Sequence, residues 1–502
     1  MAEKKRSKLG CFQCKQKKKK CDEIKPICTS CLKSNKICRY KSLENSVVKS
    51  QRKVDSIVCK DIVGEIIMKN LEHQRFDEIN IDTISYGYNN DMFKLLNEYI
   101  SPDPELKIKL PVDLSESEIG YFEYYCKSIL PELSILPQEY NFYSKIYIPL
   151  ALKEPALLYS LIGWGCKMMK NDGINYLIEN EEAEGYCKKV MGIIDQNNLY
   201  LNEEKFMVNF CSYMSLVYMN ISVGDINEWS THFTSCFNMI NRMPGNFKYL
   251  MNFSHEGILL AENFAYFDIL ASQSNENGTF YPISDYDDVF SNVSNAHDPA
   301  QGCIRPLTLI IGEIVTLLVE YSTLQVSLDL TDCSKYELMA NVIDKAEKLD
   351  KKILFTKPDL SCLKHLNTPE ELEGHLTLFD VYQISAQIYL RQVIKKLPSV
   401  VPEIEMLFFH LKEGVAFLVK TKFRKSLGFP MLVTALAATS KEDRQDVKSL
   451  FENLIQCCGY LSVYQKLWTV IQKVWELNQN GNLYVDWYKI TKQFGWRLNL
   501  GR

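Results

Sequence analysis

The residues with the clearest capacity for chemistry are six cysteines near the start of the chain: Cys11, Cys14, Cys21, Cys28, Cys31 and Cys38. Their spacing is C-x2-C-x6-C-x6-C-x2-C-x6-C, so one C-x2-C-x6-C unit occurs twice. Thiolate sulfur is a preferred ligand of zinc, and structural zinc sites are closed and tetrahedral. The repeat therefore indicates a segment that binds metal through cysteine.

The number of thiols limits the kind of metal site. Two tetrahedral zinc ions need eight ligand positions, and six thiolates fill them only if two of the thiolates bridge both ions. A segment of about 40 residues has too small a core to fold without metal or another cross-link. The sequence thus favours a binuclear cluster of two Zn²⁺ ions. The alternatives are a single four-cysteine zinc site with two spare thiols, an iron–sulfur cluster, and three disulfides.

A run of lysines lies inside the first cysteine unit, between Cys14 and Cys21. If metal holds both ends, this run forms a short rigid helix that fits the major groove of DNA. There a lysine ammonium can bond guanine O6 and N7 while its neighbours contact phosphates. We expect DNA contacts from Lys15, Lys17, Lys18 and Lys20. The alternative interpretation of such a run is a solvated face or a nuclear import signal.

The charge of the chain divides at the end of this segment. Residues 1–41 contain 14 Lys and Arg against three acidic residues, a net charge of +11, whereas the remainder carries −15. This asymmetry predicts a head that binds a polyanion and an acidic body that does not bind nucleic acid. Binding of RNA, or of polyanions without sequence preference, is an alternative for the head.

The stretch from Cys11 to Cys38, with Pro26 between the two units, resembles the Zn2Cys6 binuclear cluster of fungal transcription factors. The resemblance implies that Cys11 and Cys28 bridge the two ions. One zinc would then also be held by Cys14 and Cys21, and the other by Cys31 and Cys38. It further implies that Lys17 and Lys18 read CGG-type triplets in double-stranded DNA. This chain departs from many family members in having no arginine within the loop.

Three segments follow from composition and pattern: 1–41 as a Zn2Cys6 DNA-binding domain, 42–110 as a linker with short helices, and 111–502 as a large all-α regulatory domain. Leu43, Val47, Val54 and Ile57 form a partial heptad in the linker, which favours a homodimer only weakly because two heptads are short for a coiled coil. The fold class is therefore predicted as mainly α.

Helical periodicity dominates the body. Ser115 and Glu118 have the spacing of a capping box, and the helix they begin is predicted to stop at Pro131. Two further apolar faces are predicted near the C-terminus, one ending before Gly459 and one made of Tyr464, Leu467, Ile471 and Val474. Residues 271–300, which are rich in Ser, Asn and Asp, are predicted to form a long loop.

The body also resembles a known domain. Residues 113–169, and the aromatic-rich stretch from Leu427 to Trp496, are similar to the start and end of the second type of fungal-specific transcription factor domain. That subgroup includes yeast regulators of lysine biosynthesis and of GABA use. The resemblance implies a nuclear activator of metabolic genes, with lysine biosynthesis as one candidate pathway, that contacts the transcription machinery and responds to a small-molecule effector.

Several classes of function find no support in the sequence. No run of about 18 apolar residues is long enough to span a membrane, and the N-terminus lacks the apolar core of a secretory signal. No phosphate-binding loop, nucleophile elbow or dinucleotide fingerprint occurs, so no enzymatic activity is predicted. The four tryptophans from Trp468 to Trp496 are interpreted as core residues. The rival hypothesis is a metabolite-binding or enzymatic helical body, with the zinc head serving nuclear retention.

Overall fold

The computed structural model describes Ser30, Lys33 and residues 110–501, apart from short gaps at 175–179, 199–201, 293–299, 327–331 and 460–461. The chain divides into two compact units, Met1–Ile84 and Ser85–Arg502. Ser30 and Lys33 are both helical. The predicted metal cluster and nearly all of the predicted linker therefore lie outside the described residues, and the fold below is that of the second unit.

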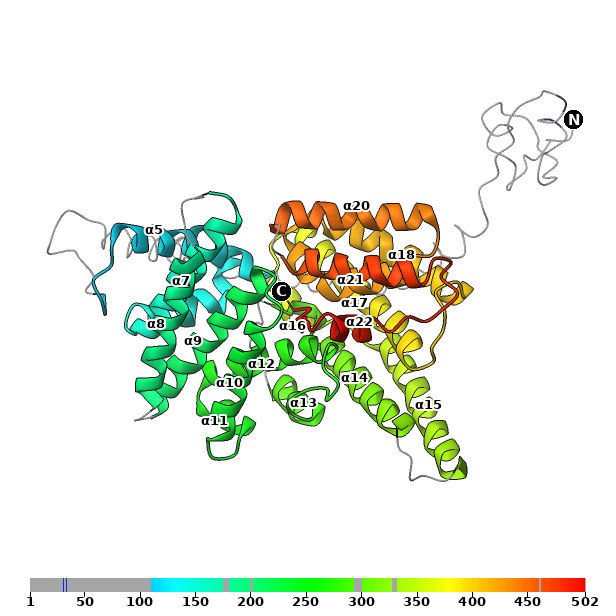
Figure 1. Ribbon diagram of the computed structural model, residues 1–502, viewed down its shortest axis with the longest axis horizontal. Coiled ribbons are helices and arrows are strands. Elements are labelled where there is room, and N and C mark those ends of the chain that lie inside the picture. Colours follow the sequence, from blue (N-terminus) through cyan, green and yellow to red (C-terminus); the bar gives the residue numbers. More distant parts are fainter. Residues whose placement is uncertain are drawn as a thin grey trace, which may run out of the picture. The chain divides into compact units, whose positions relative to one another are not determined.

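The described part of the second unit is helical and contains no strand, which confirms the predicted mainly α fold class. The helices form two groups that lie side by side in Figure 1. The α-helices of the first group are α5 (Glu116–Tyr124), α6 (Ile148–Ala151), α7 (Pro155–Asn171), α8 (Asn180–Asn198), α9 (Glu203–Ser222), α10 (Glu228–Asn241), α11 (Phe247–Phe253), α12 (His255–Ser272) and α13 (Ile283–Asn292). Those of the second group are α14 (Arg305–Val326), α15 (Asp332–Phe355), α16 (Leu360–Leu363), α17 (Pro369–Val393), α18 (Pro402–Leu418), α19 (Gly428–Ala437), α20 (Lys441–Cys458), α21 (Val463–Leu477) and α22 (Trp487–Gln493).

Short π and 3-10 segments link several of these helices. The π segments are η2 (Tyr125–Ile129) and η5 (Tyr143–Tyr147), and the 3-10 segments are η3 (Leu130–Leu133), η4 (Gln138–Tyr140), η6 (Gly302–Ile304) and η7 (Lys422–Ser426).

In the first group, α7 is the central helix and packs against α5, α8 and α9. Two glycines let its neighbours approach closely. A Cβ atom on Gly163 would lie 2.9 Å from Tyr186 Cβ of α8, and one on Gly165 would lie 2.0 Å from the carbonyl oxygen of Tyr121 on α5. The Gly-Trp-Gly sequence therefore serves helix packing and places Trp164 in the core, where it is 1% exposed.

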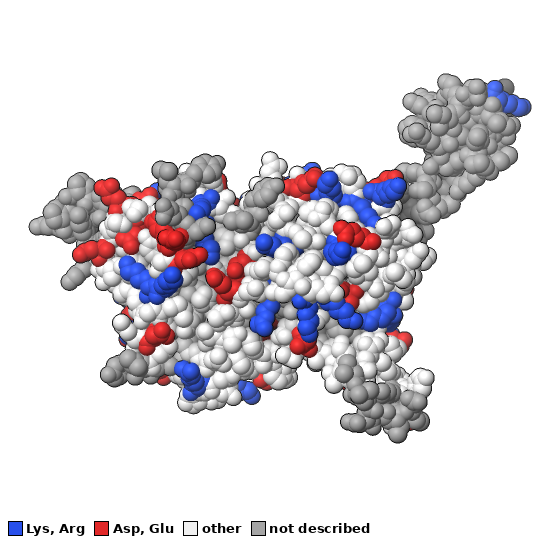
Figure 2. All heavy atoms as spheres, viewed as in Figure 1, with Lys and Arg blue, Asp and Glu red and all other residues white. Residues whose placement is uncertain are grey.

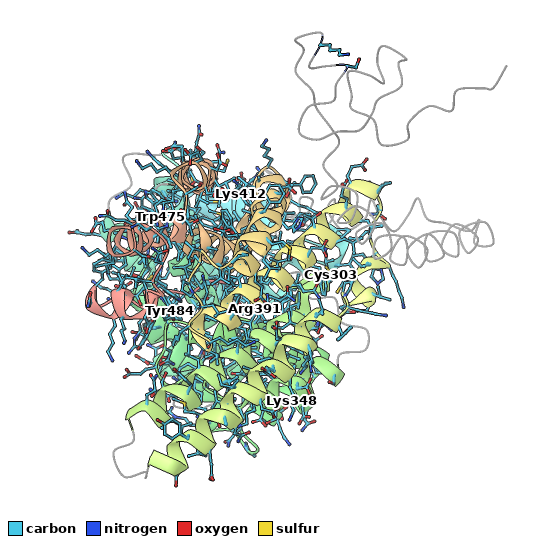
Figure 3. All side chains as sticks on the ribbon, turned by 90° about the vertical axis from the view of Figure 1, so that its right-hand side faces the viewer. Cys303, Lys348, Arg391, Lys412, Trp475 and Tyr484 are labelled. Carbon is cyan, nitrogen blue, oxygen red and sulfur yellow. The ribbon has the colours of Figure 1, made fainter. Side chains whose placement is uncertain are left out.

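In the second group, α19 occupies the centre and contacts α17, α18, α20 and α21. Polar side chains tie the surrounding helices together, and three of them are labelled in Figure 3. Lys412 of α18 lies 2.7 Å from both Asp443 and Asp446 of α20. Arg391 of α17 forms a salt bridge with Asp350 of α15, and Trp475 Nε1 donates to the carbonyl oxygen of Ala435 at 2.9 Å.

The C-terminal tail joins the two groups. After α22 the chain returns to the first group, where Arg497 N donates to Ile226 O at 2.8 Å and Trp229 Nε1 donates to Arg497 O at 3.0 Å. Ser274 Oγ, just past α12, donates to Leu498 O at 2.6 Å. The buried side chains of both groups belong to one continuous hydrophobic core.

Within the described ranges, one helix has the length and hydropathy of a membrane span. The segment Gly302–Gln325, which includes α14, passes by composition. It contains no uninterrupted run of about 18 apolar residues, because Glu313 lies within it. In its most apolar window 72% of the residues are buried inside the protein. A bent pair, Tyr143–Ala151 with Pro155–Asn171, passes only if its two helices, which meet at 116°, are counted together.

The structure corrects two local predictions. Pro131 does not stop the first helix, because the α-helix ends at Tyr124 and the chain continues as η2 and then as η3, which contains Pro131 near its start. The predicted loop 271–300 contains α13, whose Tyr286, Val289 and Phe290 are buried. Their i, i+3, i+4 spacing gives a short helix enough apolar surface to fold against the core.

Candidate functional site

A cavity of about 230 Å³ lies where the two helical groups meet. Most of its wall comes from the first group, namely from α5, η2, η3, α7 and α9. The second group closes it with η7 and with the residues on either side of the α20–α21 turn. A volume of this size is enough for a small organic molecule.

Aromatic side chains form the buried end of the cavity. Tyr218 of α9 lies between Trp164 and Phe267, with ring centroids 6.0 Å and 4.8 Å away. Tyr143 meets the Tyr218 ring edge-on at 5.6 Å. The hydroxyl of Tyr218 donates to Asn263 Oδ1, and Asn263 Nδ2 donates to Tyr143 Oη at 3.1 Å. These tyrosine hydroxyls are thus engaged within the protein, and burial raises the pKa of Tyr218 well above its usual value.

Two residues that line the cavity carry a buried polar atom with no hydrogen-bond partner among the described residues. These atoms, Trp164 Nε1 and Ser462 Oγ, belong to side chains that are 1% and 3% exposed. A buried donor without an acceptor costs about 1–3 kcal/mol, so most buried donors are paired.

Charged side chains surround the outer end. Asp172, the residue that caps α7, accepts a hydrogen bond from Tyr124 Oη at 2.5 Å. Glu132 Oε2 lies 2.5 Å from Lys425 Nζ, and Glu132 Oε1 lies 3.0 Å from Arg424 Nη2. Burial is the main cause that raises the pKa of Tyr124, and the negative charges of Asp172 and Glu132 add to it, so both carboxylates lie near its ring. No basic side chain of the described residues forms a salt bridge with Asp172.

The end of α20 and the start of α21 form part of the cavity wall on the side of the second group. The predicted apolar face of α20 is confirmed: Val447, Leu450 and Leu454 are buried, and Gly459 ends the helix with a φ of 93°. Beyond the turn, Tyr464 Oη donates to Arg424 O at 2.6 Å, which fixes η7 against α21. Cys458 lines the cavity, and its burial raises its pKa to about 11, so the thiol is protonated at neutral pH.

The metal and DNA-binding residues predicted from the sequence do not belong to this cavity. The six cysteines, Cys11, Cys14, Cys21, Cys28, Cys31 and Cys38, and the four lysines, Lys15, Lys17, Lys18 and Lys20, lie outside the described residues. No group of three or more His, Cys, Asp or Glu within the described part of the chain is arranged to hold a metal ion. The cavity itself was not predicted from the sequence.

The structure also shows the surroundings of tryptophan, histidine and cysteine side chains of the body. Trp487 is buried, and Trp468, Trp475 and Trp496 pack against the core, as predicted. His375 is a buried histidine whose Nε2 lies 3.2 Å from Ile135 O, and burial lowers its pKa to about 4. Most of the described cysteines are buried, whereas Cys457 is exposed.

Two family models match the chain. The fungal Zn(2)-Cys(6) binuclear cluster domain matches residues 9–45, which contain all six head cysteines. The fungal specific transcription factor domain matches residues 120–501, well over half of the chain. The chain belongs to the fungal Zn2Cys6 transcription factors. Residues 120–501 of the helical unit are therefore the family's transcription factor domain, and residues 9–45 are its zinc cluster domain.

Similarity to two transcription factors extends over both parts of the chain. An uncharacterized transcriptional regulatory protein of Schizosaccharomyces pombe is 35% identical over 99% of this chain and 97% of that protein. The transcriptional activator protein UGA3 of Saccharomyces cerevisiae is 22% identical over 98% of this chain and 97% of its own length. No solved structure matches this chain.

The donor set of this zinc cluster transcription factor fits its metal. The six cysteines provide only thiolate sulfur, which suits Zn²⁺, and their two repeated units offer equivalent ligands to two ions. The bound ions would supply structure rather than catalysis, because a closed thiolate site leaves no position for substrate.

Proposed function

We propose that this transcription factor is an activator that binds CGG-type triplets in double-stranded DNA and acts in the nucleus. The observation that carries the proposal is the paired C-x2-C-x6-C repeat with a lysine-rich loop inside the first unit. The match to a zinc cluster domain over residues 9–45 and the name of the activator UGA3 support it. Genes of metabolism, including lysine biosynthesis, are the proposed targets.

The six cysteines divide between the two ions in this proposal. Cys11 and Cys28 bridge, Cys14 and Cys21 complete one site, and Cys31 and Cys38 complete the other. Each bridging thiolate serves both ions, so its loss affects the whole cluster rather than one half of it.

The base contacts are assigned to Lys17 and Lys18, with Lys15 and Lys20 on the phosphates. All four lie in the loop between Cys14 and Cys21, whose ends are fixed by metal ligands. Contacts to phosphate add affinity without sequence preference, whereas contacts to guanine edges discriminate between sequences.

The test replaces one lysine in each half of the repeat. Lys18→Ala removes a proposed guanine contact, and Lys33→Ala removes an exposed helical lysine from the second half. We expect Lys18→Ala to reduce discrimination between a CGG duplex and a scrambled duplex by about 1–3 kcal/mol, and Lys33→Ala to leave it nearly unchanged. Fluorescence anisotropy of the zinc-loaded full-length chain measures both. Equal discrimination by Lys18→Ala and the wild type would reject the assignment.

The proposal extends to the partners of the body. A homodimer formed through residues 42–110, contact with the transcription machinery, and a small-molecule effector that controls activity are its remaining parts. Sedimentation of the full-length chain tests the dimer, because a monomer at micromolar concentration would exclude it.

A further inference from the structure

We propose that the cavity between the two helical groups binds a zwitterionic amino acid with an aromatic or long apolar side chain. This inference rests on the proposed function, because it supplies the effector through which the regulatory domain would sense metabolism. The family match and the two relatives do not identify a ligand or a site.

The position of the cavity suits a ligand that controls the regulatory domain. Its wall combines α7 and α9 of the first group with η7 and the α20–α21 turn of the second. A molecule bound there would contact both groups and so favour one arrangement of them. Only ligands with different affinities for two arrangements can shift the balance between them, and a shared wall provides that difference.

The shape of the cavity sets the length of the ligand. Trp164, Met168 and Asp172 follow one another at intervals of four residues along α7 and its cap, and all three line the cavity. At 1.5 Å per residue their Cα atoms span about 12 Å from the buried tryptophan to the exposed carboxylate. The ligand is therefore elongated, with a polar end near Asp172 and an opposite end near Trp164.

The charges at the outer end match both charges of an amino acid. Asp172 has no basic partner among the described residues, so it can accept an ammonium group. Lys425 and Arg424 share the carboxylate of Glu132, and this group of three carries a net positive charge that suits a carboxylate. Among lining residues the formal charges are those of Asp172, Glu132 and Lys425.

The buried end suits an apolar side chain. Met168, Ile221 and Phe267 line the cavity, and none of them offers a polar group that could pair with a charge. The hydroxyls of Tyr143 and Tyr218 are engaged within the protein.

The test titrates the full-length chain with small molecules by calorimetry. L-tyrosine and L-phenylalanine provide the whole pattern, phenethylamine lacks the carboxylate, 3-phenylpropionate lacks the ammonium group, and L-alanine lacks the apolar body. L-tryptophan, L-leucine and L-methionine extend the set of side chains. We expect saturable binding of at least one large amino acid, with about tenfold weaker binding of each truncated analogue. Failure of all five large amino acids to bind, or equal binding of L-alanine, would overturn the inference.

Two variants localise the site. Asp172→Asn is expected to weaken binding of L-phenylalanine about fivefold and to leave 3-phenylpropionate unaffected, because that analogue has no ammonium group. Asp344→Asn, which removes an exposed acid of α15 far along the chain, serves as the control and should change neither. Equal loss for both ligands, or no loss for either, would place the binding elsewhere.

The same preparation separates this inference from the proposed function. Its binding to the CGG duplex is measured alongside the titrations, without added ligand. A chain that binds the duplex specifically but none of the amino acids contradicts the cavity assignment alone. A chain that binds an amino acid but shows no preference for the duplex contradicts the proposed DNA recognition alone.

Discussion

Asp268 of α12 is a buried carboxylic acid that accepts two hydrogen bonds. It is 3% exposed, and its Oδ2 accepts hydrogen bonds from Tyr286 Oη at 2.5 Å and from Phe280 N at 2.7 Å. Burial raises its pKa from 3.8 to about 7, although the two hydrogen bonds oppose the shift. The folded protein therefore holds this proton more tightly than the unfolded chain does.

The sign of the resulting pH dependence follows from that difference. The stabilisation by protonated Asp268 is complete below about pH 4 and is lost as the pH rises towards 7. We expect Asp268→Asn, which keeps an acceptor oxygen without the charge, to remove a pH-dependent part of the unfolding free energy of the order of 2–4 kcal/mol between these limits. Urea unfolding at several pH values, followed by tryptophan fluorescence, measures it. Identical pH profiles for wild type and variant would show that Asp268 does not titrate in this range.

Gly165 of α7 lies against the backbone of α5 and leaves no room for a side chain. Because an added Cβ would lie 2.0 Å from Tyr121 O, α7 must move away from α5 in Gly165→Ala. We expect a loss of about 1–3 kcal/mol in unfolding free energy, as for other overpacked cores. Gly192→Ala in α8 is the matched control, since a Cβ there meets nothing within 4 Å and alanine favours a helix by up to about 1 kcal/mol. Equal stability of the two variants would show that the close approach of α5 and α7 is not required.

At the scale of elements, the end of α20 depends on Gly459. Its φ of 93° and ψ of 152° lie in a region that is essentially restricted to glycine. An added Cβ would also lie 2.4 Å from Asn171 Nδ2 at the end of α7. The glycine therefore fixes the turn into α21 beside the cavity.

Gly459→Ala should cost about 2–3 kcal/mol because both the backbone conformation and the contact with Asn171 are unfavourable. Gly495→Ala separates these causes. Gly495 also has a positive φ, of 68°, but a Cβ there meets nothing within 4 Å, so the expected loss is about 1 kcal/mol. The denaturation midpoints of the two variants provide the comparison, and a smaller effect at Gly459 than at Gly495 would contradict it.

The sequence predicted elements well where one local signal decided them. The capping box at Ser115 is present, with Glu118 N donating to Ser115 Oγ and Ser115 N donating to Glu118 Oε2. The apolar face of Tyr464, Leu467, Ile471 and Val474 is buried. Prediction failed at α13 because its polar composition resembles a loop, and only burial of Tyr286 and its neighbours by other helices stabilises it.

At the scale of the whole molecule, the two candidate sites differ in how far the sequence reveals them. The six cysteines lie within a short stretch, so their spacing alone indicates the donor set. The cavity takes its walls from residues as distant along the chain as Tyr124 and Tyr464, and nothing in either local pattern predicts that they meet. Figure 2 shows both acidic and basic side chains on one face of the body. In the sequence, the net charge is +11 over residues 1–41 and −15 over the remainder.

This division predicts that the two parts of the molecule respond separately to removal of zinc. All six tryptophans, the first of which is Trp164, lie in the unit Ser85–Arg502, whereas the six cysteines proposed as zinc ligands precede it in the sequence. We expect a strong zinc chelator to lower affinity for the CGG duplex by about 10³-fold or more, to the level of non-specific binding. Tryptophan emission should stay unchanged, because the regulatory core contains no zinc ligand of the cluster.

Anisotropy of a labelled duplex and intrinsic emission, recorded on the same full-length sample, measure the two responses together. Addition of zinc in excess of the chelator serves as the control and should restore binding, because the six thiolates can recover their metal. A change in tryptophan emission that accompanies the loss of DNA binding would contradict the separation, since it would make zinc part of the fold of the helical body.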